Sequence, residues 1–113
     1  MDDINLTIDE VIHICSIVHI EDHTLSFDAY GKNNIRESTL GFLYRHGMDV
    51  LDGERIINNL KKEELVKGPV DNYLDPSKPK LWIFNKKYLG LKLYIKLMIY
   101  NKRRRVAVVS LHD

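Results

Sequence analysis

The sequence contains few residues of the kinds that link distant segments through covalent bonds or metal ions. It has one cysteine, Cys15. Proline and tryptophan are also scarce, with three residues and one residue respectively. A single thiol cannot form a disulfide within the chain, and the helical pattern of apolar residues around Cys15 favours a buried thiol with no chemical role. Of the five histidines, only His19 and His23 are spaced as metal ligands, and they fall where a loop or strand is expected. We therefore expect neither a metal nor a cofactor, and a metal-dependent phosphate-ester enzyme is the weakest of the functions considered.

The sequence also lacks a long apolar run, an internal repeat and a low-complexity tract. No segment approaches the roughly 18 apolar residues that cross a membrane, and the opening Met1 to Asp3 is acidic. These absences predict a cytoplasmic chain with neither a signal peptide nor a membrane partner. With 113 residues and 44% hydrophobic composition, residues 1–113 are expected to form a single domain around one core.

Charge is divided unevenly along the chain. Residues 1–66 carry 6 Lys and Arg against 13 Asp and Glu, a balance of −7, whereas residues 67–113 carry 11 against 3, a balance of +8. The basic half predicts a surface for a polyanion such as RNA. The alternative interpretation is that the basic run from Lys102 to Arg105 is a solvated turn.

Helices are predicted before strands along the chain. Thr7 and Glu10 form a capping-box pattern ahead of the first helix. The ranges expected to be helical are 8–18, 35–45, 54–60 and, as a short turn, 61–67. The ranges expected to be strands are 20–27, 81–84, 92–100 and 106–112, with connections at 28–34, 70–79 and 85–90. This order predicts an α+β fold in which an antiparallel β-sheet is covered on one face by N-terminal helices.

The segment from Lys92 to His112 predicts a β-hairpin with two different faces. From Leu91 to Ile99 the odd positions are aliphatic, and this period of two is typical of a strand. Placing Asn101 opposite Arg105 leaves a three-residue loop, an allowed hairpin length. The apolar face then pairs Ile99 with Ala107, Leu97 with Val109 and Ile95 with Leu111, and the other face pairs Met98 with Val108, Lys96 with Ser110 and Tyr94 with His112.

Tyr94, Lys96, Ser110 and His112 would therefore share one surface, with Lys67 and several arginines available. The 2′-hydroxyl of RNA attacks the adjacent phosphate when a base removes its proton, an acid protonates the leaving 5′-oxygen, and cations stabilise the added negative charge. Histidine suits proton transfer because its unperturbed pKa is roughly 6.5, while lysine and arginine suit charge stabilisation. A structural interpretation remains for each residue: a penultimate histidine is commonly an exposed end residue, a strand tyrosine commonly packs, and a lysine is commonly solvated.

The order and spacing of several segments carry a resemblance to a known family. They are the block from His46 to Gly53 with its continuation to Leu60, then Lys67, the strand Leu81 to Phe84, the strand Tyr94 to Lys96, and the closing Val109 to His112. Together these segments, within roughly residues 38–112, resemble the motility quorum-sensing regulator (MqsR) toxins, which are messenger-RNA interferases of bacterial type II toxin–antitoxin systems.

The resemblance implies a RelE-like ribonuclease fold and metal-free cleavage of messenger RNA. It also implies a cognate antitoxin that neutralises the toxin and often represses their shared operon, so that operator DNA is contacted only through the antitoxin. The family's active-site lysine falls on Lys67, its strand tyrosine on Tyr94 and its C-terminal lysine on His112. Histidine at that last position would suit proton transfer better than charge stabilisation alone. A glutamine of the best-known members falls on Ile83, which cannot hydrogen-bond a base edge.

The leading hypothesis is thus a messenger-RNA endoribonuclease inhibited by a protein partner. His112 would act as general acid or base, Tyr94 would hold or relay a proton, and Lys67 and Lys96 would stabilise the transition state. The residues expected to bind RNA are Trp82, by stacking on a base, and Arg103, Arg104 and Arg105, by contacting flanking phosphates. The alternative is a non-catalytic RNA- or protein-binding module that uses the basic face and binds RNA in a salt-dependent way without product.

Overall fold

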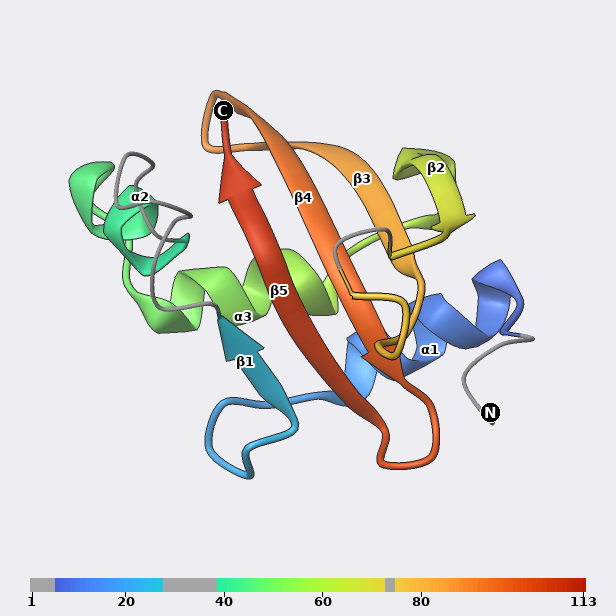
Figure 1. Cartoon of the computed structure of the whole chain (residues 1–113). Helices are drawn as coiled ribbons and strands as arrows, with labels where there is room; N and C mark the ends of the chain where they lie inside the picture. The colour runs from blue at the N-terminus through green and yellow to red at the C-terminus, as the bar shows by residue number, and fades with distance from the viewer. Residues whose placement is uncertain (1–5, 28–38, 73–74) are drawn as a thin grey trace.

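The computed structural model describes residues 6–27, 39–72 and 75–113 (Figure 1). The connection expected at residues 28–34 and the expected start of the second helix, residues 35–38, lie outside the described residues. The elements in chain order are α1 (Ile8–Ile17), β1 (Leu25–Phe27), α2 (Thr39–Arg45), α3 (Val50–Asn58), the 3-10 helix η2 (Lys62–Glu64), β2 (Leu65–Val70), β3 (Leu81–Tyr88), β4 (Leu91–Tyr100) and β5 (Arg105–His112).

Side-chain caps set where α1 and α3 begin. The Thr7 hydroxyl accepts a hydrogen bond from the backbone N–H of Glu10, and the Glu10 carboxylate accepts one from the backbone N–H of Thr7, which confirms the predicted capping box. Asp49 and Asp52 cap α3 in the same reciprocal way. The helix therefore begins at Val50, and the predicted start at Glu54 was wrong because the cap at Asp49 starts the helix four residues earlier.

The α3 cap also holds a charge at the helix N-terminus. The backbone N–H of Asp49 donates to the Asp52 carboxylate and lowers the pKa of that carboxyl group, with further lowering from the Tyr88 hydroxyl and from Arg55. A negative charge at this position interacts favourably with the helix dipole. The cap thus joins the start of α3 to the end of β3.

The five strands form one sheet in the order β1-β5-β4-β3-β2. The pairs β2–β3, β3–β4 and β4–β5 are antiparallel, and β1 lies parallel to β5. The predicted α+β fold is confirmed, and Figure 1 shows β4 and β5 passing in front of α1 and α3. The sheet is therefore mixed rather than purely antiparallel, and the chain between β1 and β5 is long enough for the crossover that a parallel pair requires.

The core lies between the helices and the face of the sheet turned toward them. Its fully buried side chains come from α1, α2, α3 and every strand except β2; the largest are Phe42, Phe84, Ile14, Leu43, Ile56, Ile57, Leu93, Ile95, Leu97 and Ile99. Cys15 has no exposed surface, and burial raises the pKa of its thiol to about 12, as expected of an unreactive core cysteine. Among the described residues, no helix has both the length and the apolar character needed to span a membrane.

Two segments, one predicted as a helical turn and one as a connection, lie partly in strands. Residues 61–67 were predicted as a helical turn, but only Lys62–Glu64 is helical, and the chain then enters β2. Residues 85–90 were predicted as a connection, whereas β3 runs on to Tyr88, which pairs with Leu91 across a two-residue turn. β3 is thus twice as long as the predicted strand, and its added half places Asn85 and Lys87 in the sheet.

That turn explains why the end of β3 was missed. Its two central residues, Leu89 and Gly90, have φ of +50° and +82°. A turn with positive φ at both positions matches the twist of a hairpin, and it favours Asn or Asp followed by Gly. Leucine in the first position is unfavourable, so the sequence lacks the usual turn signal.

Leu89→Asn should therefore stabilise the protein. Leu89 is 74% exposed, so little burial is lost, and a left-handed conformation costs an ordinary side chain roughly 1–2 kcal/mol, of which Asn avoids part. We expect the free energy of unfolding, measured by urea denaturation, to rise by about 0.5–1 kcal/mol. Leu89→Val, which is β-branched, should lower it. Equal or lower stability of the Asn variant would contradict this account of the turn.

Candidate functional site

The face of the sheet opposite the helices carries all the residues predicted for catalysis. Directly opposed residues of neighbouring strands share a face, so the strand register gives its composition. We call this the open face. Across the strands it consists of the rows Lys87 and Lys92; Asn85, Tyr94 and His112; Lys67, Ile83, Lys96 and Ser110; and Leu81, Met98 and Ala107.

Tyr94 and His112 form the centre of the site. Their rings stack with centroids 4.9 Å apart and planes inclined by 27°. The Nζ atom of Lys96 lies 6.0 Å from the centroid of the Tyr94 ring. His112 is exposed, and its Nδ1 lies 3.1 Å from the backbone oxygen of Asp113. The other ring nitrogen, Nε2, is not part of this contact. The imidazole, the phenol and an ammonium group are thus grouped on an accessible surface.

A β-bulge decides this arrangement. The predicted pairs Tyr94 with His112, Ile95 with Leu111 and Lys96 with Ser110 are confirmed. Beyond them the register shifts by one residue, so that Leu97 pairs with Val108, Ile99 pairs with Val106, and the hairpin loop has four residues, 101–104.

The predicted register was therefore wrong near the loop. Val106 and Val108 are fully buried in the main core, whereas Ala107 and Val109, predicted for that core, belong to the smaller apolar cluster of the open face. The extra residue of the bulge changes the alternation of β5. Without it, the strand that buries Val106 and Val108 would turn His112 toward the core as well.

Lys67 joins the same face from the edge strand β2. It is exposed and lies opposite Ile83, which in turn lies opposite Lys96. Strands are spaced by roughly 4.8 Å, so the backbones of Lys67 and Lys96 are roughly 10 Å apart, a gap that two lysine side chains can span around a phosphate.

Gly68 allows β2 to lie this close to β3. Its φ is +142°, and a Cβ atom on it would lie 3.0 Å from the carbonyl oxygen of Leu81 and 3.1 Å from the Cα of Trp82. Both neighbours are backbone atoms that cannot easily move aside, so a larger residue would displace the strand that carries Lys67.

The residues predicted to bind RNA are not brought to this centre. Trp82 is 3% exposed and packs in the core on the helix side of the sheet, so it is not available to stack on a base at the open face. Arg103 and Arg104 are exposed in the hairpin loop, and the guanidinium carbon of Arg105 lies 4.3 Å from the centroid of the Tyr100 ring. Tyr100 lies six positions along β4 from Tyr94, roughly 20 Å of strand, so the arginines can reach only distant phosphates.

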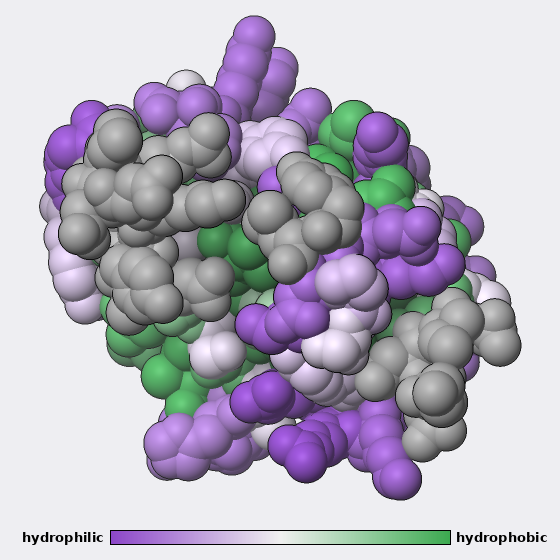
Figure 2. Space-filling view, in the orientation of Figure 1, coloured by the Kyte–Doolittle hydropathy of each residue, from purple (hydrophilic) through white to green (hydrophobic). Residues whose placement is uncertain are grey.

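The lysines of the open face are not paired with carboxylates of the described residues. Two other lysines have acidic partners: Lys86 Nζ lies 3.2 Å from Glu64 on the helix side, and Lys80 Nζ lies 3.5 Å from Asp71. Within the described part of the chain, no ion pair involves the four lysines of the open face, which are Lys67, Lys87, Lys92 and Lys96. Figure 2 views the molecule from this side and shows hydrophilic residues around its margins and right of the centre, with hydrophobic residues between them.

One end of the open face is covered by the chain itself. Asn72 is buried, and its side-chain amide donates to the carbonyl oxygen of Pro79 at 3.3 Å and contacts the sulfur of Met98 at 3.4 Å. Asn72, just after β2, thereby packs on the apolar row of Leu81, Met98 and Ala107 at this end of the face. The accessible part of the face is the half that carries Tyr94 and His112.

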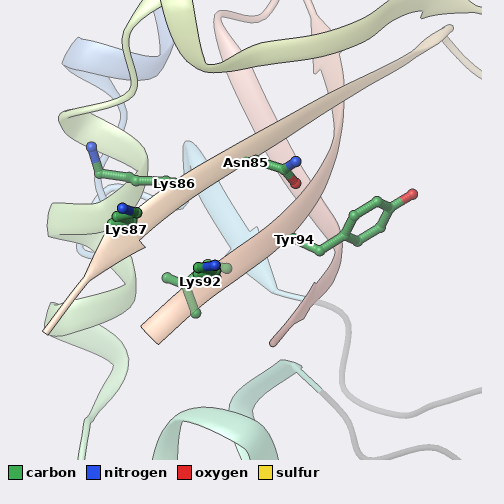
Figure 3. Close-up of a pocket in the computed structure, with 6 residues that line it drawn as sticks. Asn85, Lys86, Lys87, Lys92 and Tyr94 are labelled. Carbon is green, nitrogen blue, oxygen red and sulfur yellow. The ribbon is translucent and has the colours of Figure 1, made fainter. Parts of the chain in front are cut away.

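A cavity of about 310 Å³ adjoins Tyr94 on this accessible half. It is lined by Asn85, Lys86, Lys87, Lys92, Leu93 and Tyr94. Figure 3 shows Asn85 and Tyr94 pointing to the same side of the two strands, whereas Lys86 points the other way, toward its partners Glu64 and the carbonyl oxygen of Asn59. Asn85, Lys87 and Lys92 were not predicted as site residues. Residues 82–87 read as three apolar residues followed by three polar ones, without the alternation of a half-buried strand, so no local pattern placed Asn85 and Lys87 on the open face.

The histidines do not assemble a metal site. His19 Nδ1 lies 3.6 Å from a carboxylate oxygen of Glu54, and no group of three His, Cys, Asp or Glu side chains that could hold a metal ion occurs among the residues with described positions. Comparisons of the chain with protein-family models, with curated proteins and with solved structures returned no match.

Proposed function

We propose that this protein is a metal-independent endoribonuclease that cleaves messenger RNA at the open face. The observation that carries the proposal is the stacked pair of Tyr94 and His112 beside Lys96, on a face whose lysines form no ion pair with any carboxylate among the described residues. An imidazole, a phenol and ammonium groups are sufficient for transfer of the phosphoryl group to the neighbouring 2′-oxygen. The resemblance to MqsR toxins supports the same activity and a RelE-like ribonuclease fold.

In the proposed reaction the 2′-oxygen forms a bond to phosphorus while the bond from phosphorus to the 5′-oxygen breaks. One group removes the proton of the 2′-hydroxyl and another supplies a proton to the departing 5′-oxygen, so the products are a 2′,3′-cyclic phosphate and a 5′-hydroxyl. His112 acts as general acid or base, and Tyr94, in contact with its ring, holds or relays the second proton. Lys96 and Lys67 stabilise the charge that develops on the phosphorane.

The cellular role in this proposal is that of a toxin in a type II toxin–antitoxin system. A cognate antitoxin neutralises the enzyme, and contact with operator DNA occurs only through that partner. The proposal predicts growth arrest when the gene is expressed and recovery when a small neighbouring gene is expressed with it.

The direct test is cleavage of a synthetic single-stranded RNA in the presence of EDTA. We expect fragments with 2′,3′-cyclic phosphate and 5′-hydroxyl ends, because the chain's own side chains supply every group that the reaction needs. A substrate with 2′-deoxyribose at the cleaved position should be inert, since it lacks the nucleophile. Cleavage that stops in EDTA, or that persists on the deoxy substrate, would refute the mechanism.

The unpaired lysines of the open face also support a second function, a module that binds RNA without cleaving it. Such a module would bind RNA with an affinity that falls steeply with salt and would release no product. The same RNA, followed by both electrophoresis and fluorescence anisotropy, separates the two functions.

A further inference from the structure

We infer that Asn85, Lys87 and Lys92 form a subsite that holds the nucleotide next to the scissile phosphate, with Asn85 reading the base and the two lysines binding its phosphate. This inference rests on the proposed function for the location of the scissile phosphate. The subsite itself is an open hollow of about 310 Å³ lined by residues of the paired strands β3 and β4. Its ligand is single-stranded RNA, and its neighbour on the sheet is the pair Tyr94 and His112.

The placement of the two lysines indicates an anion. Lys87 and Lys92 lie directly opposite each other on neighbouring strands, both exposed. Like charges in this arrangement destabilise a sheet, and in the described chain neither lysine forms an ion pair with a carboxylate that would offset the repulsion. A bound phosphate would relieve that repulsion. Lys86, the residue before Lys87, forms an ion pair with Glu64, so a lysine of this strand is paired where it faces the helices.

The position of Asn85 suits a base edge. It is directly opposite Tyr94, which is opposite His112, so these three residues form one row across the sheet. Asn85 is exposed, and its amide makes no hydrogen bond with the residues that the structure describes. A side-chain amide carries both donors and an acceptor and can recognise an unstacked base. The neighbouring open-face residue of β3, Ile83, offers no such group.

The dimensions limit the ligand to a single strand. The cavity lies at the small end of the range for ligand pockets, about 300–1,000 Å³, which is room for one nucleotide. The row of Lys87 and Lys92 is two residues along β4 from Tyr94, or about 7 Å, which is comparable with the step between neighbouring phosphates of an extended strand. A phosphate on the lysine pair thus leaves the next phosphate at Tyr94 and His112.

The test measures binding separately from cleavage. The probe is a short, fluorescently labelled 2′-O-methyl RNA, which lacks the attacking hydroxyl and cannot be cleaved by the proposed reaction. We expect the double variant Lys87→Gln, Lys92→Gln to bind it at least tenfold more weakly at low salt. The slope of log affinity against log salt should fall by about 0.7 for each phosphate that the variant no longer neutralises. The matched control is Lys61→Gln, Lys62→Gln, which removes the same charge near η2 and should bind like the wild type.

Asn85→Ala tests base reading on cleavable RNAs that differ only at the nucleotide beside the cleaved bond. We expect the wild type to prefer one base at that position and the variant to lose the preference by about tenfold or more, through KM rather than kcat. Circular dichroism of each variant checks that the sheet is retained.

The outcomes distinguish this inference from the proposed function. If the wild type cleaves RNA and the double lysine variant binds the probe with unchanged affinity and salt slope, the subsite is refuted and the nuclease stands. If the wild type binds the probe through these lysines but releases no product from cleavable RNA, the lysine subsite stands and the nuclease is refuted. Unchanged base preference in Asn85→Ala would remove Asn85 from recognition.

Discussion

His112→Ala should reduce the rate of RNA cleavage in EDTA by about 10²- to 10⁴-fold, the range that a general acid or base contributes. The reason is geometric as well as chemical: the imidazole stacks on Tyr94 at 4.9 Å on an exposed surface, where a phosphate can reach both groups. The measurement is the single-turnover rate with a synthetic RNA at saturating enzyme. Because His112 is exposed on the terminal strand, its truncation should leave the fold intact.

Two further variants make the result specific to His112. His13→Ala removes an exposed histidine on α1, away from the sheet face, and should cleave at the wild-type rate. Tyr94→Phe keeps the ring stack but removes the hydroxyl, so a loss of rate there reports on proton relay rather than on packing. A loss of less than tenfold in folded His112→Ala would remove this residue from the mechanism.

Lys96→Gln should lower kcat by about 10²- to 10³-fold, as found for the removal of one group that stabilises developing negative charge. Lys96 lies in the row next to Tyr94 and His112, with its ammonium group 6.0 Å from the Tyr94 ring. Lys96→Arg retains the positive charge and should recover part of the rate. Lys62→Gln, on the helix side, is the charge-matched control and should have no effect.

The division of the loss between kcat and KM decides the role of Lys96. An interaction made only in the transition state lowers kcat, whereas uniform binding of substrate raises KM alone. If Lys96→Gln raised KM and left kcat unchanged, Lys96 would be an RNA-binding residue, and charge stabilisation in the transition state would have to come from elsewhere.

Local patterns predicted much of the fold because they depend on neighbouring residues. The capping box of Thr7 and Glu10 predicted the start of α1, and the alternation from Leu91 to Ile99 predicted β4. The missed elements lacked their usual local signal. Leu89 occupies a turn position that favours Asn, so the sequence did not signal a tight turn there. Residues 85–90 were therefore predicted as a connection rather than as the end of β3, and the subsite residues Asn85 and Lys87 were missed with it.

The sequence by itself determined that β4 is amphipathic and that Tyr94 and Lys96 share one of its faces, because alternation within a strand follows from backbone geometry. The parity of an unbroken hairpin also predicted that His112 joins them, but only the tertiary structure decided how, because the pairing near the loop differs and a bulge restores the predicted pairs. The aliphatic residues from Val106 to Val109 could present either alternate pair to the core, and the choice depends on packing against the helices. The core takes Val106 and Val108, and the bulge after Val108 changes the alternation, because only an extra residue allows one strand to bury its first half and still expose the imidazole at its end.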